Sequence, residues 1–198
     1  MEIVLRAAVP DDVGHIGRFI LASTPYLRYI FGNRVEPVLT ALIRSRWSVF
    51  SWKYVRLAEV GSKVVGMLLG YAWKERSLFE DVASGMRMFL HGRGHFVRNL
   101  PYLWKLRDVT GYVNRGEYYV SNVAVAPEYR GMGIGKKLME TAFALARRKG
   151  TRAVALDVEE DNTPALNLYR RMGFVNVGVR ETVLKGRRLK FLRMVRYL

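Results

Sequence analysis

Three glycines alternate with other residues in the stretch APEYRGMGIGKK (126–137), which follows an apolar run and precedes an amphipathic helical pattern. A helix N-terminus leaves backbone N–H groups unpaired and carries partial positive charge. Glycines have no Cβ, so a ligand can approach that backbone closely, and phosphate or pyrophosphate suits such a cradle best. Arg130, Lys136 and Lys137 add full positive charges. The stretch therefore predicts a phosphate-binding turn, with a tight helix entry that binds nothing as the alternative.

The spacing of these glycines does not match two common phosphate loops. A P-loop requires G-x-x-x-x-G-K-S/T, but Arg130 lies five residues before Gly135, and Lys137 occupies the Ser/Thr position. A dinucleotide-binding fingerprint requires G-x-G-x-x-G, whereas this chain has G-x-G-x-G in the middle of the sequence. We therefore expect neither a nucleoside triphosphatase nor a dinucleotide-binding enzyme.

A second motif lies downstream, in LDVEEDNTPALNLYRRMGF (156–174). It consists of a short strand followed by Asn162, Ala165, the Leu168-Tyr169 pair and a terminal Gly173-Phe174. Together with R-x-x-G-x-G at 130–135, and in this order, it resembles the GNAT superfamily of acetyl-CoA-dependent N-acetyltransferases. The second motif is most similar to the branch that acetylates peptide N-termini.

The resemblance implies direct transfer of an acetyl group from acetyl-CoA to a primary amine of a peptide, protein or small molecule. An ammonium must lose a proton before it can attack the thioester. The tetrahedral intermediate then needs donors for its oxyanion, and the departing CoA thiolate benefits from a proton. The chain contains no cysteine, which agrees with a reaction that forms no acyl-enzyme. The alternative is a nucleic-acid-associated or acyl-CoA-sensing binding protein on the same fold, without turnover.

The resemblance also implies catalytic residues. Tyr169 matches the family tyrosine whose hydroxyl approaches the CoA sulfur, so it is the candidate general acid, with a core aromatic on an amphipathic helix as the alternative. Glu117 matches the strand position of the glutamate base in the histone-acetylating branch. Asp157 matches the carboxylate that accompanies the tyrosine in the ribosomal-protein N-terminal-acetylating branch. The base is therefore Glu117, Asp157 or water alone, with Glu117 preferred.

The resemblance further implies how the chain holds CoA. Backbone groups of the strand segment 122–125 are expected to pair with the pantetheine arm like an added strand. N–H groups of the glycine turn are expected to face the pyrophosphate, and Asn162 to contact the CoA arm unless it only caps its helix. The predicted cofactor-binding residues are Val123, Ala124, Val125, Arg130, Gly131, Met132, Gly133, Ile134, Gly135, Lys136, Asn162 and Tyr169.

These motifs need a sheet with helices packed on it, and the hydrophobic pattern indicates one. Strand-like and helical runs predict an α/β protein with the GNAT fold, a mixed sheet of six to seven strands flanked by helices. The expected order is β-α-α-β-β-(helical insert)-β-α-β-α-β-β within a single N-acetyltransferase domain, 1–198. The insert spans about 74–115, with helices near 76–90 and 99–109, and an earlier helix is predicted over 34–48.

Composition limits the function further. The 198 residues carry a net charge of +16, no cysteine and three histidines, which argues against disulfides and metal sites. The charge favours anionic partners, and seven basic residues in 180–198 would suit RNA, although no nucleic-acid motif accompanies them. No apolar run is long enough to span a membrane, and no signal peptide is evident. We therefore expect a cytoplasmic protein without a metal or a membrane partner; a homodimer is compatible with the sequence.

Overall fold

The computed structural model describes residues 2–198, apart from the side chains of residues 107 and 108. Within this part of the chain, seven strands form one sheet in the order β1-β2-β3-β4-β5-β7-β6. β4 and β5 are parallel neighbours, and the other pairs are antiparallel. The strands are β1 (Val4–Ala7), β2 (Val55–Val60), β3 (Lys63–Ala72), β4 (Glu117–Val125), β5 (Ala153–Glu159), β6 (Val175–Leu184) and β7 (Arg187–Tyr197).

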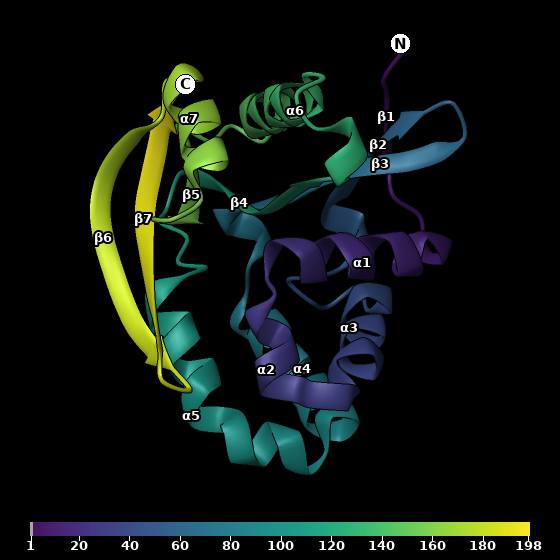
Figure 1. Ribbon diagram of the computed structural model, residues 1–198, viewed down its shortest axis with the longest axis vertical. Helices are drawn as coiled ribbons and strands as arrows, with labels where there is room; N and C mark the ends of the chain where they lie inside the picture. Colours follow the sequence, from purple (N-terminus) through teal and green to yellow (C-terminus); the bar gives the residue numbers. More distant parts are fainter. Residues whose placement is uncertain (1) are drawn as a thin grey trace.

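Helices cover both faces of the sheet, which confirms the predicted mixed sheet flanked by helices (Figure 1). They are α1 (Val13–Ser23), α2 (Tyr26–Phe31), α3 (Val35–Arg44), α4 (Leu78–Gly92), α5 (Gly94–Val109), α6 (Ile134–Arg148) and α7 (Thr163–Arg171). The insert therefore contains α4 and α5, and α5 begins earlier than the helix predicted at 99–109. No helix in the described residues is both long and apolar enough to cross a membrane.

The sheet separates two hydrophobic cores. In one core, Ile16 of α1 and Leu42 of α3 pack with Met67 of β3; in the other, Leu138 of α6 packs with Leu68 of β3. Met67 and Leu68 are neighbours in sequence, but successive side chains of a strand point to opposite faces of the sheet. The alternation in β3 thus holds helices on both sides and fixes where α6 begins relative to the sheet.

The helix predicted over 34–48 ends earlier, at Arg44. Ser45 has extended backbone angles, and its hydroxyl accepts a hydrogen bond from the N–H of Trp47 at 3.0 Å. Such local bonds between serine side chains and the backbone compete with helical hydrogen bonds. The apolar periodicity that continues past Arg44 therefore belongs to an irregular segment, and an additional short helix, α2, precedes α3.

β4 and β5 pair along only the first part of their length. Their register runs from Glu117 opposite Ala153 to Val120 opposite Leu156. Beyond that point β4 continues along β3 as far as Val125, and β5 continues along β7. The two strands therefore diverge, and a wedge opens between them in the middle of the sheet.

A β-bulge in β4 lies where this divergence begins. The register between β3 and β4 shifts between Leu69 and Gly70, which leaves Ser121 outside the pairing. A bulge bends its strand and increases the local twist, so it turns β4 away from β5. Gly70 leaves no room for a side chain: a Cβ there would lie 2.7 Å from Cε1 of Tyr118, whose hydroxyl donates to the Gly70 carbonyl at 2.9 Å.

We expect Gly70→Ala to lower the free energy of unfolding by about 1–3 kcal/mol, the usual cost of forcing an extra methyl group into a packed core. Urea denaturation monitored by tryptophan fluorescence measures this change. Gly14→Ala is the matched control, because Gly14 lies in α1 with no atom within 4 Å of an added Cβ. The control should be neutral or stabilising by up to about 1 kcal/mol. Equal effects of the two substitutions would contradict a steric role for Gly70.

Candidate functional site

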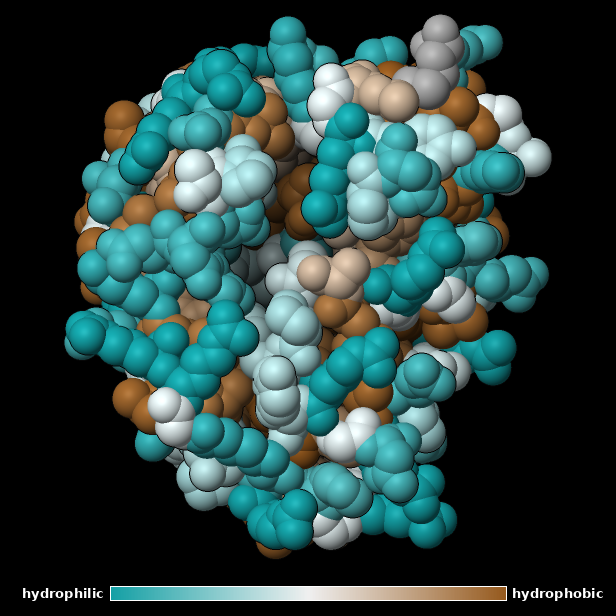
Figure 2. Space-filling model, in the orientation of Figure 1, coloured by the Kyte–Doolittle hydropathy of each residue, from teal (hydrophilic) through white to brown (hydrophobic). Residues whose placement is uncertain are grey.

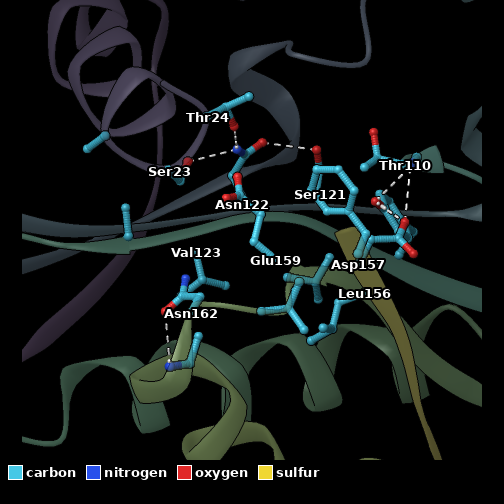
Figure 3. Close-up of a pocket in the computed structure, with 18 of the residues that line it drawn as sticks. Ser23, Thr24, Thr110, Ser121, Asn122, Val123, Leu156, Asp157, Glu159 and Asn162 are labelled. Atoms are coloured by element: carbon cyan, nitrogen blue, oxygen red, sulfur yellow. Dashed lines mark hydrogen bonds between the residues drawn. The ribbon is translucent and has the colours of Figure 1, made fainter. Parts of the chain in front are cut away.

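A cavity of about 1330 Å³ occupies the wedge between β4 and β5. It begins at the glycine turn before α6, passes along the diverging strands and the start of α7, and ends among residues of α4 and α5. Figure 2 shows the surface hollowed between the two halves of the molecule, and Figure 3 shows side chains around the middle of the cavity. The cavity thus joins the predicted phosphate-binding turn to the helical insert.

The glycine turn lines one end of the cavity. Gly131 and Gly133 have φ angles of 78° and 79°, a left-handed conformation that glycine adopts readily. Gly133 is the N-cap of α6, so the first N–H groups of this helix have no partner within it. These groups and the positive end of the helix dipole suit a diphosphate. The residues of the turn that line the cavity are Arg130, Gly131, Gly133, Ile134, Gly135 and Lys136.

Three side chains of the turn lie differently from one another. Met132 was predicted to bind the cofactor but does not line the cavity, and its side chain is half exposed. Arg130 does line it, and its Nε donates to the carbonyl of Val125 at 3.2 Å, which leaves its Nη groups free to reach an anion. Lys136 lies on the surface, 3.8 Å from Glu140. The two basic side chains therefore flank the turn, whereas Met132 lies outside the cavity lining.

The diverging part of β4 presents backbone groups to the cavity. The N–H of Ala126 donates to a carbonyl of β3 at 2.8 Å, and alternate residues of an antiparallel strand direct their backbone groups to opposite edges. The backbone groups of Val123 and Val125 therefore face the wedge, whereas those of Ala124 face β3. The bond from Arg130 to the Val125 carbonyl agrees with this orientation. Val123 and Val125 are thus the residues with which an extended ligand can pair.

α7 brings Asn162 and Tyr169 to the cavity. Asn162 caps the helix, because its side-chain oxygen accepts a hydrogen bond from the N–H of Ala165 at 3.3 Å. Tyr169 is 8% exposed, and its ring packs against that of Phe174 with 5.7 Å between centroids. Burial raises the pKa of Tyr169 to about 12, so its hydroxyl keeps its proton at neutral pH. Each side chain therefore has a structural role and also contacts the cavity.

Asp157 is the first residue of β5 beyond its pairing with β4, and it lines the cavity. Its Oδ2 accepts hydrogen bonds from the Tyr119 hydroxyl (2.8 Å), the Gly111 N–H (3.1 Å) and Nη1 of Arg193 (3.4 Å). Burial raises the pKa of Asp157, although Arg193, Tyr119 and Gly111 oppose the rise. A buried carboxylate with a raised pKa beside a cavity is suited to accept a proton.

Glu117, the base preferred from the sequence, does not line the cavity. It lies in the paired part of β4, opposite Ala153, and its carboxylate accepts hydrogen bonds from Nη2 of Arg193 at 2.5 Å and from two nitrogens of Asn114 at 2.9 and 3.0 Å. A carboxylate enclosed by three donors and set back from the cavity is poorly placed to take a proton from a bound amine. The structure therefore separates the two candidate bases and brings only Asp157 to the cavity.

Sequence reasoning missed Arg193 and Tyr119. Arg193 lies on β7 directly opposite Asp157, and its buried guanidinium bridges the carboxylates of Asp157 and Glu117 and lies 5.3 Å from the centre of the Tyr119 ring. Arg193 is one of the seven basic residues of 180–198 that would suit RNA, but its side chain is only 8% exposed and so does not present its charge at the surface. A usable signal was present: Arg193 is the one charged residue within the apolar run 191–195, which is typical of a buried, paired cation.

The insert lines the end of the cavity opposite the glycine turn. The side chains there are mostly apolar and come from both insert helices: Ser84 and Met88 of α4, and Phe96, Leu103 and Trp104 of α5. In the described part of the chain, no group of three or more His, Cys, Asp or Glu side chains is arranged to hold a metal ion. This end therefore offers shape and apolar contact to whatever enters it.

Asn122 joins β4 to the end of α1 on the wall of the cavity. Its Nδ2 donates to the hydroxyls of Ser23 and Thr24, both at 2.8 Å, and its Oδ1 accepts from the Ser121 hydroxyl at 3.0 Å (Figure 3). Because Asn122 is buried and its bonds are made to α1, this helix is held at a fixed distance from the wedge. The width of the cavity at this point thus depends on Asn122.

Comparison with known proteins agrees with this geometry. A model of the acetyltransferase (GNAT) family matches residues 34–174. A mycothiol acetyltransferase of Arthrobacter sp. (strain FB24) is 48% identical over 64 residues, which are 32% of this chain and 19% of that protein. N-alpha-acetyltransferase 30 of Saccharomyces cerevisiae is 42% identical over 59 residues, 30% of this chain and 34% of that protein. These matches therefore span about a third or less of the curated relatives.

One solved structure compares over almost the full length. The crystal structure of an acetyltransferase superposes with a TM-score of 0.70 and 22% sequence identity, and the match covers 98% of each chain. At this identity the likeness concerns the fold alone.

Arg193→Met should lower the free energy of unfolding at pH 7 by about 3–5 kcal/mol, because it leaves the Glu117 and Asp157 carboxylates buried without their cation. Burial raises the pKa of Asp157 and Arg193 opposes the rise, so without Arg193 the folded state binds a proton at Asp157 more readily than the unfolded state. The loss should therefore shrink as pH falls towards 4. Guanidinium denaturation at several pH values measures it.

Arg188→Met serves as the control for this experiment. Its partner, Glu181, forms an ion pair with it at 2.5 Å on the exposed surface of the C-terminal hairpin. The denaturation midpoint of this control should hardly change, because exposed ion pairs contribute little. A loss in Arg193→Met that did not depend on pH would point to lost packing and would contradict the electrostatic explanation.

Proposed function

The chain belongs to the GNAT family of acetyltransferases, and we propose that it transfers an acetyl group from acetyl-CoA to a primary amine of a peptide, protein or small molecule by direct attack. The observation that carries this proposal is the continuity of one cavity from the glycine turn, past Asp157 and Tyr169, to the insert. A diphosphate at one end and an amine at the other would meet beside groups able to move protons. The proposal treats 1–198 as one N-acetyltransferase domain with the insert at 74–115, acting in the cytoplasm.

The proposed CoA site follows from the edge of β4 and the start of α6. N–H groups of Gly133, Ile134, Gly135 and Lys136 would hold the diphosphate, with Arg130 adding charge. The backbone groups of Val123 and Val125 that face the wedge would pair with the pantetheine arm as an added strand does, and the Val125 carbonyl would share its bond from Arg130. Ala124 lies between them and turns its backbone groups to β3, so we assign it no pairing of its own. Asn162 and Tyr169 would contact the arm from α7.

The proposed proton transfers use three buried side chains, those of Tyr119, Asp157 and Tyr169. The substrate ammonium would first lose a proton to Tyr119, whose own hydroxyl proton would pass along its 2.8 Å hydrogen bond to Asp157, and the neutral amine would then attack the thioester. Tyr169 would give its proton to the departing thiolate of CoA, a role supported by the pKa of about 12 that keeps its hydroxyl protonated. The raised pKa of Asp157 supports its role as base. We assign no proton transfer to Glu117, whose carboxylate is held by Arg193 and Asn114.

The α-amine of a peptide is the acceptor that we favour. The motif at 156–174 resembles the peptide N-terminal-acetylating branch, and one relative is named an N-alpha-acetyltransferase. An α-ammonium, with a pKa near 8, loses its proton more easily than a lysine side chain, with a pKa near 10.4. A weak base such as Asp157 therefore suits the α-amine better.

The nucleic-acid alternative receives less support. Three basic residues of the C-terminal hairpin, Arg187, Arg188 and Lys190, pair with carboxylates, and Arg193 is buried. A surface whose cations are already paired attracts phosphates less strongly. An acyl-CoA-sensing protein without turnover would use the same glycine turn. Release of free CoA in the presence of an acceptor distinguishes an enzyme from such a sensor.

Acetyl-CoA should raise the melting temperature, because a ligand that binds only the folded state adds about 2.7 kcal/mol of stability at a hundred times its Kd. Differential scanning fluorimetry measures the shift. Acetyl-pantetheine, which lacks the diphosphate, is the control and should give a much smaller shift at the same concentration. Equal shifts with the two compounds would contradict diphosphate binding at the glycine turn.

Tyr169→Phe and Asp157→Asn should each lower kcat by about 10²–10⁴-fold, the usual contribution of a general acid or base, while the affinity for CoA changes little. Release of CoA is followed with a thiol reagent, which the cysteine-free chain does not consume. Peptides, polyamines and amino acids are tested as acceptors in this assay. Tyr197→Phe, at an exposed position, is the control.

The pH profile separates the two roles. Because the pKa of Asp157 is raised, kcat/KM should fall as pH drops through a value above its ordinary 3.8, and Asp157→Asn should lack this fall. If Tyr169→Phe turns over an accepted substrate as fast as the native protein, Tyr169 is not the general acid.

A further inference from the structure

The two insert helices expose an extensive apolar surface. Nine large apolar side chains, 37–79% exposed, form it: Leu78, Phe79, Val82, Met86, Phe89 and Leu90 of α4, and Val97, Leu100 and Trp104 of α5. We call these residues the insert face. The six members on α4 recur at helical spacing and share one side of that helix. Exposed large apolar side chains that gather on one side of a helix are typical of an interaction site.

α4 buries polar residues and exposes apolar ones, the reverse of the usual arrangement of a surface helix. Its buried residues are Glu80, Ser84 and Gly92, whereas Leu78, Val82 and Leu90 are exposed. A helix at the surface of a water-exposed domain normally turns its apolar stripe to the core and its polar side outward. Packing within the described part of this chain therefore leaves the insert face uncovered.

The charges beside the insert face are positive. Among the described side chains of α4, α5 and the residue between them, the exposed charged residues are Arg93, which joins the two helices, and Arg98 and Lys105 of α5. The acidic residues Glu80 and Asp81 form ion pairs with basic side chains of the same chain, at 3.0 and 3.3 Å. The whole protein carries a net charge of +16. A partner of this surface must therefore be apolar inside and negatively charged at its boundary.

We propose that the insert face docks on the surface of an anionic phospholipid bilayer. Its apolar side chains enter the region between headgroups and acyl chains, and Arg93, Arg98 and Lys105 lie at the anionic headgroups. A second copy of the chain fits less well, because two such faces would bring their basic residues together. From the sequence we predict no membrane partner, because no apolar run is long enough to span a bilayer. Docking at the surface needs no such run, so this proposal departs from that prediction. Docking is independent of the proposed acetyl transfer.

The arrangement of the cavity gives docking a consequence. Leu100 and Trp104 belong to the insert face and also line the cavity. The glycine turn precedes α6, which lies at the end of the molecule away from α5 (Figure 1). A docked protein therefore keeps its glycine turn in water while the other end of its cavity opens beside the lipid.

Co-sedimentation of the full chain with vesicles tests the proposal without CoA or any acceptor. We expect it to bind vesicles of phosphatidylcholine containing about 30% phosphatidylglycerol, and to bind pure phosphatidylcholine at least tenfold more weakly. Each basic residue near an anionic surface contributes about 1 kcal/mol, or roughly fivefold in affinity. Binding to the anionic vesicles should therefore weaken as sodium chloride screens these charges.

Two sets of variants separate the apolar and the charged contributions. The triple variant Val82→Gln, Met86→Gln, Leu90→Gln, at positions 55–60% exposed, should weaken binding at least tenfold. Its control is Val177→Gln, Val179→Gln, Val183→Gln on β6, at positions 50–52% exposed. The triple variant Arg93→Gln, Arg98→Gln, Lys105→Gln should weaken binding about 100-fold. Arg147→Gln, Arg148→Gln, Arg152→Gln is the control with the same loss of charge elsewhere on the surface.

Three outcomes would overturn docking on lipid. The first is no binding to anionic vesicles at low salt by the native chain. The second is a control variant that weakens binding as much as its matched insert variant, which would show that total charge or hydrophobicity is responsible. The third is a dimer in light scattering that the Val82, Met86, Leu90 variant dissociates, which would assign the insert face to a second copy. Circular dichroism checks that each variant is folded.

Discussion

The end of the hydrogen-bond ladder between β4 and β5, after Val120 and Leu156, is the constraint on which the rest of the site depends. Each strand keeps its other neighbour, so the sheet stays intact while its centre opens. The bulge at Ser121 bends β4 at this point, and the close approach of Tyr118 to Gly70 explains why the opposite strand carries a glycine there. The wedge thus provides both a cavity and a strand edge whose unpaired backbone groups can bind an extended ligand.

Arg193 couples the chemistry of the wedge to the stability of the fold. Its guanidinium is shared by Glu117, behind the cavity, and Asp157, on it, and both carboxylates are buried. Arg193 lies 2.5 Å from the Glu117 carboxylate but 3.4 Å from that of Asp157. The negative charge of Asp157 is therefore only partly balanced by the guanidinium. This unequal sharing agrees with the raised pKa of Asp157, since burial outweighs the attraction of Arg193.

The sequence predicted the sheet, the glycine turn and α7 well, because each depends on local signals such as periodicity, glycine and a capping residue. It could not separate Glu117 from Asp157. Glu117 lies on β4 and Asp157 on the neighbouring parallel strand β5. Only the register, with Glu117 opposite Ala153, shows that Asp157 lies beyond the point where the strands diverge and that Glu117 lies before it. Arg193 was missed for the same reason: its partner Asp157 lies 36 positions away, and that pairing follows from tertiary structure.

Hydrophobic periodicity also leaves open which side of a helix meets the core. The pattern of α4 defines an apolar side, and packing in the core was the natural expectation for it, yet the chain buries Glu80 and Ser84 and exposes Val82 and Leu90. Glu80 reaches inward because Lys53 and the Tyr54 hydroxyl bind its carboxylate at 3.0 and 2.9 Å. Polar contacts in the interior thus orient α4. The apolar side of α4 then faces outward, and only a partner outside the chain could shield it from water.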